Sequence, residues 1–331
     1  MEKTVKKVTK KVSDKRKKVT GKTKKTSDKK TDTKKTKTTK TVSKTKKTVK
    51  GKKKIALVLE GGGMRGAYTA GCLSWLIDHN IEFDGAYGIS SGAVHLVSYL
   101  YGNKKWLEKM STYYIPEKSS IGLGGFLKEG QVCAFDYKFA NAYRHLGFTT
   151  KNLKTKVKAK IGLYDLNSGH DIYYPIEEVN DEMLKAACSL PILSVSRKVN
   201  GHEYLDAGIT DMIPIEKAVK DGYDGMLVIT TKAKDYVRKK TSPVIVNLMK
   251  IWYKRCPNVA KDYAVRAENY YKQLNLINKL VDEGRAVYRY PTVNMTNITR
   301  FGGEPEDLRK LYALGRSDME AIKKDIFKLV K

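Results

Sequence analysis

Long apolar stretches are absent from this chain of 331 residues. No run of about 18 apolar residues could span a bilayer, and no apolar core of about 7–15 residues follows the N-terminal lysines, as a signal peptide would require. The four cysteines lie far apart, without the C-x-x-C pairs that are typical of zinc and redox sites. We therefore expect a cytoplasmic protein with reduced thiols and without a bound metal ion.

Acidic residues are fewer than basic ones, and the imbalance is concentrated at one end of the chain. Lys and Arg number 65 against 35 Asp and Glu, a net charge of +30, and residues 1–54 alone hold 25 basic and 4 acidic side chains. This segment contains no aromatic residue, Leu or Ile, so it lacks the apolar area that offsets the entropy lost on folding. We predict a disordered basic tail, attracted to an anionic membrane surface or, through the same charges, to nucleic acid.

Strands and helices are predicted to alternate once the basic tail ends. The apolar run at 55–60 is typical of a buried strand, and residues 67–80 have apolar side chains at helical spacing. The pattern repeats with a strand at 83–90 and a helix at 92–102. Two consecutive strand–helix units imply a parallel sheet that is covered by helices.

The rest of the chain continues this pattern in a predicted catalytic domain over residues 55–240. A helix ends near Pro191, and an Asn-Gly pair marks a hairpin whose second strand leads into Asp206. Residues 116–150 are irregular and glycine-rich, and we expect them to form a loop over the site. We predict that residues 241–331 are a mainly helical extension packed on the catalytic domain.

The sequence GISSG at residues 88–92 lies between a predicted strand and a predicted helix. In that setting G-x-S-x-G is typical of a nucleophile elbow, a tight and strained turn that presents a serine hydroxyl at the head of a helix. Ser90 occupies the nucleophile position, whereas Ser91 occupies the variable position and is expected to point elsewhere. The motif predicts acyl transfer through a serine.

The sequence EGGGMRG at residues 60–66 follows the first predicted strand and could bind one of several anions. It fits the G-x-G-x-x-G pattern of dinucleotide sites through Gly61, Gly63 and Gly66. Such a site also needs an acid at the end of the second strand, but Asp84 stands at the beginning of that strand. A P-loop is not supported either, because Ala67 stands where a lysine should follow the last glycine.

The oxyanion of an acyl-transfer intermediate suits this glycine loop better. The N–H groups of Gly62 and Gly63, with the positive end of the helix beyond Gly66, would concentrate hydrogen-bond donors there. In a parallel sheet, this loop and the turn at Ser90 both lie at the carboxyl ends of strands. One crevice therefore explains both motifs.

The serine needs a general base, which could be a histidine or an aspartate. None of the five histidines follows His202, so a Ser–acid–His order would need His202 or an earlier histidine, paired with an acid such as Asp165 or Asp171. His202 follows the Asn-Gly turn and is expected to be exposed, and His95 is expected to be a packed or surface residue of its helix. Asp206 ends a strand before a small-residue turn, where a partly desolvated carboxylate could act as the base or merely cap the turn.

Three motifs in this order resemble the patatin-like phospholipase family: LVLEGGGMRGAYTAG, GISSGA and YLDAGITDMIPIEKA. The family pattern is G-G-G-x-[RK]-G, then G-x-S-x-G, then D-G-[GA]. The resemblance covers about residues 55–231, and the last hundred residues look like the helical extension of bacterial members. One departure is Ala207, which replaces the first glycine of the third motif and would be strained if that position had a positive φ.

The resemblance implies a three-layer α/β/α fold with a mainly parallel sheet and a Ser–Asp dyad that uses neither a histidine nor a cofactor. By motif position, Ser90 is the nucleophile and Asp206 is the proton acceptor. The oxyanion loop comprises Gly61, Gly62, Gly63, Arg65 and Gly66.

We therefore predict a serine lipid acyl hydrolase, similar to phospholipases A and lysophospholipases, that cleaves fatty-acyl esters. The basic tail would hold the domain peripherally at the inner, anionic surface of a membrane. The alternative is a polyanion-binding protein, for nucleic acid or an anionic membrane, whose hydrolase domain is inactive or serves as a scaffold.

Overall fold

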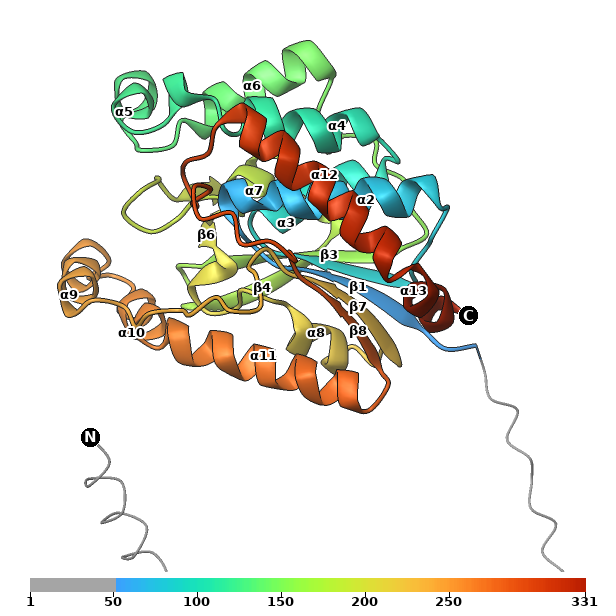
Figure 1. Ribbon diagram of the computed structural model, residues 1–331. Helices are drawn as coiled ribbons and strands as arrows, with labels where there is room; N and C mark the ends of the chain where they lie inside the picture. The colour runs from blue at the N-terminus through green and yellow to red at the C-terminus, as the bar shows by residue number, and fades with distance from the viewer. Residues whose placement is uncertain (1–51) are drawn as a thin grey trace, which may run out of the picture. The chain divides into compact units, whose positions relative to one another are not determined.

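An eight-stranded, mainly parallel sheet with helices on both faces makes up residues 52–331, the part of the chain that this computed structural model describes (Figure 1). The predicted three-layer α/β/α fold is confirmed. The predicted basic tail falls almost wholly on residues 1–51, outside the described residues. Each strand is hydrogen-bonded to the next in the order β5 (Arg197–Val199), β6 (His202–Asp206), β3 (Lys158–Asp165), β2 (Gly85–Gly88), β1 (Ile55–Leu59), β7 (Gly225–Ile229) and β8 (Ala286–Arg289), with β4 (His170–Pro175) also paired to β3.

The two predicted strand–helix units open the described region. Every residue of β1 is buried, because β1 lies between β2 and β7 and helices cover both of its faces. β1 leads through the glycine loop into α2 (Gly66–Asp78), and β2 leads through GISSG into α3 (Ser91–Leu100). The strands run parallel with Leu59 opposite Gly88, so both turns lie at the same edge of the sheet.

Helices from both halves of the chain cover the sheet. α2, α3 and α12 (Pro305–Ala321) lie on one face, whereas α8 (Ile215–Lys220) and α11 (Arg266–Asp282) lie on the other (Figure 1). None of the helices in residues 52–331 has the length and apolar character needed to cross a bilayer. The remaining α-helices of this region are α4 (Lys104–Lys109), α5 (Leu123–Glu129), α6 (Phe135–Leu146), α7 (Asp181–Ala186), α9 (Pro243–Trp252), α10 (Asn258–Ala264) and α13 (Lys323–Val330).

Residues 241–331 do more than cover the sheet with helices. They contribute β8, which pairs in parallel with β7 at one end of the sheet. The strand has only four residues and is followed by a proline, so it shows no clear periodicity in the sequence. α12 meanwhile packs along α2, which places this region directly against the first strand–helix unit.

Residues 116–150 are not the irregular loop that their glycine content suggested. They form α5 and α6, which end at Gly130 and Gly147 with φ of 65° and 68°. A left-handed residue after the last helical turn is a common helix stop, and glycine adopts it without strain. These glycines therefore mark where helices end.

Two strands that run toward each other along β3 position the candidate site. β2 pairs with the first part of β3 and β6 with its last part, both on the edge opposite β4. β2 ends at Gly88 and β6 ends at Asp206, so that one β3 residue, Gly162, separates the two ends. A Cβ at Gly162 would lie 2.4 Å from Ile89 and 3.3 Å from Ala207, the residues that follow the two strands. The turn after β2 and the turn after β6 therefore lie next to each other.

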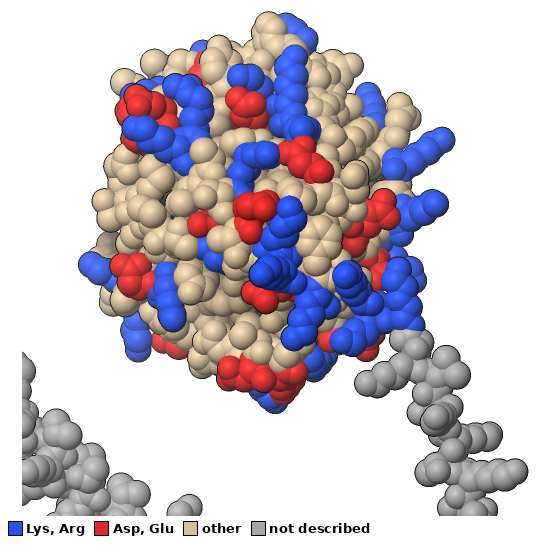
Figure 2. Space-filling model, turned by 45° about the vertical axis from the view of Figure 1, so that its right-hand side comes forward, with Lys and Arg blue, Asp and Glu red and all other residues tan. Residues whose placement is uncertain are grey.

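The surface of the folded region carries mixed charge. On the face seen in Figure 2, Lys and Arg side chains are interspersed with Asp and Glu side chains. This agrees with the sequence, in which residues 55–331 carry only +9 of the net charge of +30.

Candidate active site

Ser90 stands at the strained turn that G-x-S-x-G predicts. Its backbone has φ of 55° and ψ of −127°, a conformation that non-glycine residues seldom adopt, and α3 begins at the next residue. A Cβ at Gly92 would lie 2.8 Å from the carbonyl oxygen of Leu59, so the helix start packs directly on the end of β1. The turn thus directs the Ser90 side chain away from the sheet at the head of α3.

Asp206 ends β6 as a buried carboxylate with 1% of its surface exposed. One oxygen accepts a hydrogen bond of 2.7 Å from the N–H of Gly208, so the residue does cap its own turn. Burial raises the pKa of Asp206, although the hydroxyl of Ser90, the N–H of Gly208 and the charges of Arg266 and Arg300 oppose that rise. The carboxylate therefore faces the serine in a desolvated environment.

The substitution at Ala207 causes no left-handed strain. Ala207 does not adopt a positive φ and instead begins a short 3-10 turn. Its methyl group packs against the β3 backbone at Gly162. The departure from the D-G-[GA] pattern is thus compatible with the geometry of Asp206.

The glycine loop offers fewer free N–H groups than the sequence suggested. The N–H of Gly61 donates to the carbonyl of Met212 at 3.1 Å, and the N–H of Gly62 donates to the hydroxyl of Ser91 at 2.9 Å. Within residues 52–331, the N–H groups of Gly63 and Ser91 have no acceptor. Two unsatisfied donors therefore flank the serine turn, one from the loop and one from the start of α3.

Gly66 and Arg65 have different surroundings from those expected of oxyanion donors. The N–H of Gly66 is bonded to carbonyls of the preceding turn, and a Cβ there would lie 2.9 Å from both Ser91 Oγ and His95 Nε2. Gly66 therefore permits close packing of α2 on α3. Arg65 is half-buried, and burial lowers the pKa of its guanidinium.

No histidine among residues 52–331 is hydrogen-bonded to Ser90, although His95 lies near Ser91 at the start of α3. His202 lies 3.2 Å from Asp165, but it stands at the start of β6, about 13 Å along the strand from Asp206. Asp171, the other acid considered, accepts a hydrogen bond from Thr210. His95 is buried, which lowers its pKa to about 4. In the part of the chain that the structure describes, no three His, Cys, Asp or Glu side chains are grouped so as to hold a metal ion.

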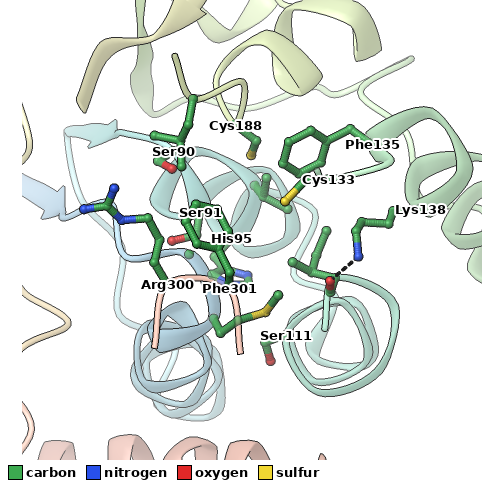
Figure 3. A pocket seen from close by; sticks show the side chains of 15 residues that line it. Ser90, Ser91, His95, Ser111, Cys133, Phe135, Lys138, Cys188, Arg300 and Phe301 are labelled. Carbon is green, nitrogen blue, oxygen red and sulfur yellow. Dashed lines mark hydrogen bonds between the residues drawn. The ribbon is translucent and has the colours of Figure 1, made fainter. Parts of the chain in front are cut away.

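An apolar cavity opens on one side of Ser90. Figure 3 shows Phe135 and Cys133 on this side, whereas the guanidinium of Arg300 turns toward the other. Its one buried cation, Lys138, donates at 2.6 Å to the carbonyl of Ile115. The apolar side chains that line this cavity are Met64, Val94, Ile115, Phe135, Leu190 and Phe301.

A second cavity also opens at Ser90 and has a different chemistry. Asp206 and the three glycines of the loop line it, together with five basic side chains. We call it the cationic cavity. Its basic residues are Arg65, Lys232, Arg238, Arg266 and Arg300.

Lys232 and Glu60 form a buried ion pair next to the glycine loop. The fully buried Glu60 pairs with Lys232 and accepts hydrogen bonds from the N–H and hydroxyl of Thr231 at 2.6 and 2.9 Å. Lys232 also donates to the carbonyl of Gly61 at 3.3 Å, and burial lowers its pKa to about 7. The sequence analysis missed Lys232, although it lies shortly after β7, at the strand ends where ligands bind in parallel sheets.

Comparisons with known proteins give matches to family models, to a bacterial protein and to a solved structure. The family model described as patatin-like phospholipase matches residues 57–219, and one described as a domain of unknown function (DUF6363) matches residues 256–331. The uncharacterized protein YjjU of Escherichia coli (strain K12) is 24% identical over 288 residues, which cover 80% of this chain and 75% of YjjU. The crystal structure of VipD from Legionella pneumophila matches with a TM-score of 0.45 and 12% identity, over 84% of this chain and 67% of VipD.

The two matched regions meet at the candidate site. The first contains the glycine loop, Ser90 and Asp206, whereas the second supplies Arg266 and Arg300 of the cationic cavity. The surroundings of the serine are therefore assembled from both regions of the chain.

Proposed function

We propose, from the premise that the chain belongs to the patatin-like phospholipase family, that it hydrolyses fatty-acyl esters of lipids with Ser90 as nucleophile and Asp206 as base. The family is one of lipid acyl hydrolases. The observation that carries the specific proposal is that β2 and β6 end on either side of Gly162, so that a strained serine turn faces a buried carboxylate. No histidine is needed in this arrangement.

In the proposed reaction, Asp206 accepts the proton of Ser90 as Oγ attacks the acyl carbonyl carbon. The resulting oxyanion is stabilised by the N–H groups of Gly63 and Ser91, and the alcohol takes the proton from Asp206 as it leaves. Water then attacks the acyl-enzyme by the same route and releases the fatty acid. A carboxylate whose pKa is raised by burial is a better base than an exposed one.

The apolar cavity gives the fatty-acyl chain a place to bind. It begins at Ser90 and extends between α3 and the α5–α6 region, lined by aliphatic and aromatic side chains. Transfer of a chain from water into such a cavity is favourable by about 0.8 kcal/mol per methylene. The alcohol portion of the ester would then lie toward the cationic cavity.

The test is hydrolysis of fatty-acyl esters by the purified full-length chain and its Ser90→Ala variant. We expect the variant to lose at least about 10⁴-fold in kcat, since the nucleophile is gone. Ser98→Ala is the matched control, because Ser98 is another buried serine of α3 and bonds only to the backbone of its own helix. An esterase activity that survives in Ser90→Ala would overturn the proposal, and an inactive wild type would favour the scaffold alternative.

We further propose that the basic segment at residues 1–54 holds the enzyme at an anionic membrane surface. Each Lys or Arg near such a surface contributes about 1 kcal/mol, and salt screens the attraction. In sedimentation with anionic liposomes, the full chain should be found with the liposomes, whereas a chain that starts at Ile55 should not. Equal binding of both chains would exclude the segment as the anchor, and preferential binding to nucleic acid would favour the alternative partner.

A further inference from the structure

Buried arginines elsewhere in the described region have carboxylate partners, whereas those beside Ser90 do not. Arg197 pairs with Asp136 at 2.8 Å, and Arg289 pairs with Asp318 at 3.1 Å. Arg238 is only 8% exposed, yet within residues 52–331 it forms no ion pair, and its Nε has no hydrogen-bond partner. A buried cation without a counter-ion is costly, so this one calls for an anion that the described chain does not supply.

Arg266 is in a similar position on the opposite wall of the cavity. It is 9% exposed, and its Nε donates to the carbonyl of Gly208 without forming an ion pair in the described part of the chain. Burial and the like charges of Arg300 and Arg238 lower its pKa to about 10. Five basic side chains and one carboxylate, Asp206, line the cavity, so positive charge is in excess here.

The carboxylates near the cavity are already engaged. Glu60 is bound by Lys232 and Thr231, and Asp206 faces Ser90 and Gly208. Aromatic rings support the arginines instead, since the Arg238 guanidinium lies 4.3 Å from the centre of the Tyr270 ring. Such stacking leaves the N–H groups at the edge of a guanidinium available for a bidentate anion.

We propose that the cationic cavity binds the headgroup phosphate of the lipid substrate, and that the preferred substrates are acylglycerols carrying a phosphate monoester. The inference rests on the proposed function, because it places the scissile ester at Ser90. A phosphate monoester brings up to two negative charges to a cavity lined by five cations and one carboxylate. A choline or ethanolamine headgroup would instead bring an ammonium group among arginines, which repel it.

The geometry of the two cavities fits a glycerophospholipid. In such a lipid the ester carbonyl and the headgroup phosphate are separated by only a few bonds, so their binding sites must adjoin. Ser90 lines both cavities, and Arg300 lies between them. The acyl chain can therefore occupy the apolar cavity while the phosphate meets Arg238 and Arg266.

The test compares two acyl lipids in the same neutral-detergent micelles, with the full-length protein. Phosphatidic acid carries the phosphate monoester, and diacylglycerol with the same acyl chains lacks it. We expect the wild type to have a higher kcat/KM for phosphatidic acid than for diacylglycerol or phosphatidylcholine. In Arg238→Gln, the ratio of kcat/KM for phosphatidic acid to that for diacylglycerol should fall about 10- to 100-fold, the usual range for a charged hydrogen bond.

Controls separate this inference from the proposed function. Arg300→Gln provides a second variant on another loop in case Arg238→Gln does not fold, and it should lower the same ratio. Arg309→Gln, on an exposed face of α12, should leave the ratio at the wild-type value. Glycerol 3-phosphate should inhibit hydrolysis of diacylglycerol by the wild type more strongly than inorganic phosphate does, which distinguishes a headgroup site from a site for free phosphate.

Three results would overturn the headgroup inference while leaving the proposed function intact. These are a wild type that hydrolyses phosphatidylcholine as well as phosphatidic acid, an unchanged ratio in both variants, and inhibition by inorganic phosphate that equals inhibition by glycerol 3-phosphate. A wild type that hydrolyses none of the lipids and does not react with a serine-directed probe would instead refute the proposed function.

Discussion

The two cavities that meet at Ser90 differ in whether the protein provides partners for the buried charged side chains in their walls. In the apolar cavity the buried Lys138 is bonded to backbone carbonyls, and the rest of the wall is mostly apolar. In the cationic cavity Arg238 and Arg266 are buried without carboxylate partners in the described residues. The first cavity resembles the interior of any folded domain, whereas the second is incomplete without an anion. This contrast is the reason why we propose that the lipid tail binds in the apolar cavity and the headgroup in the cationic cavity.

The largest expected effect comes from removing the proposed base, Asp206. Asp206→Asn should lower kcat for a soluble p-nitrophenyl ester about 10⁴-fold, because the amide cannot accept the Ser90 proton. The matched control is His202→Ala, which removes the exposed partner of Asp165. Loss of activity in His202→Ala, with activity kept in Asp206→Asn, would reverse the assignment of the base.

Substitution of Gly63, which lines both cavities, should lower kcat nearly as much. Gly63 has φ of 60°, and a Cβ there would lie 2.3 Å from the carbonyl oxygen of Arg300. We expect Gly63→Ala to displace the loop and to cost about 100- to 1,000-fold in kcat, the range for a lost oxyanion donor. Gly222→Ala is the control, because Gly222 has φ of 83° but no atom near the added methyl group. Equal activities of the two variants would show that the N–H of Gly63 has no catalytic part.

The sequence predicts some parts of the candidate site and not others. Ser90 and Asp206 are identifiable as candidates because each ends a predicted strand. Parallel pairing accounts for the closeness of the serine turn and the glycine loop, whereas Asp206 reaches the serine because β6 runs antiparallel to β3 and toward the end of β2, which the sequence did not predict. Whether the N–H groups of Gly62 and Gly66 are free could not be predicted, since their acceptors depend on tertiary packing. The same holds for the fold, where alternating patterns indicated most strands but the four-residue β8 lacked a periodic signal.

The cationic cavity could not be predicted from the sequence either, because tertiary packing brings its residues together. Arg238 and Arg300 belong to loops, and Arg266 begins a helix that packs on the far face of the sheet. In a chain with 65 Lys and Arg, nothing in the sequence distinguishes these three arginines from surface residues. Their common feature is that they line one cavity, which only the folded chain reveals.

Filling the apolar cavity should change chain-length selectivity. Val94 is buried on α3 and lines the cavity, so Val94→Phe should occupy part of the space for the acyl chain. The ratio of kcat/KM for a palmitoyl ester to that for a butyryl ester should fall about 10-fold, as expected when a pocket loses room for a few carbon atoms. Val244→Phe, at an exposed position of α9, should leave the ratio unchanged. If both variants behave alike, the acyl chain binds elsewhere.

The smallest expected effect is the influence of the positive charges in the cationic cavity on the pKa of Asp206. Asp206 must be deprotonated to act as base, and burial raises its pKa above the usual 3.8, so kcat/KM should rise with pH through a midpoint above 3.8. The positive charge of Arg300 lowers that pKa. Arg300→Gln should therefore move the rising limb to higher pH, and Arg309→Gln should not. A shift to lower pH in Arg300→Gln would contradict this account of the electrostatics.

The central claim is that one serine, Ser90, is activated where the two cavities meet. Reaction of the full-length protein with a fluorophosphonate, followed by intact-mass measurement and peptide mapping, tests it directly. We predict one label per chain, located on Ser90, present in Ser98→Ala and absent from Ser90→Ala. A folded wild type that takes up no label, or a label on another serine that persists in Ser90→Ala, would contradict the claim.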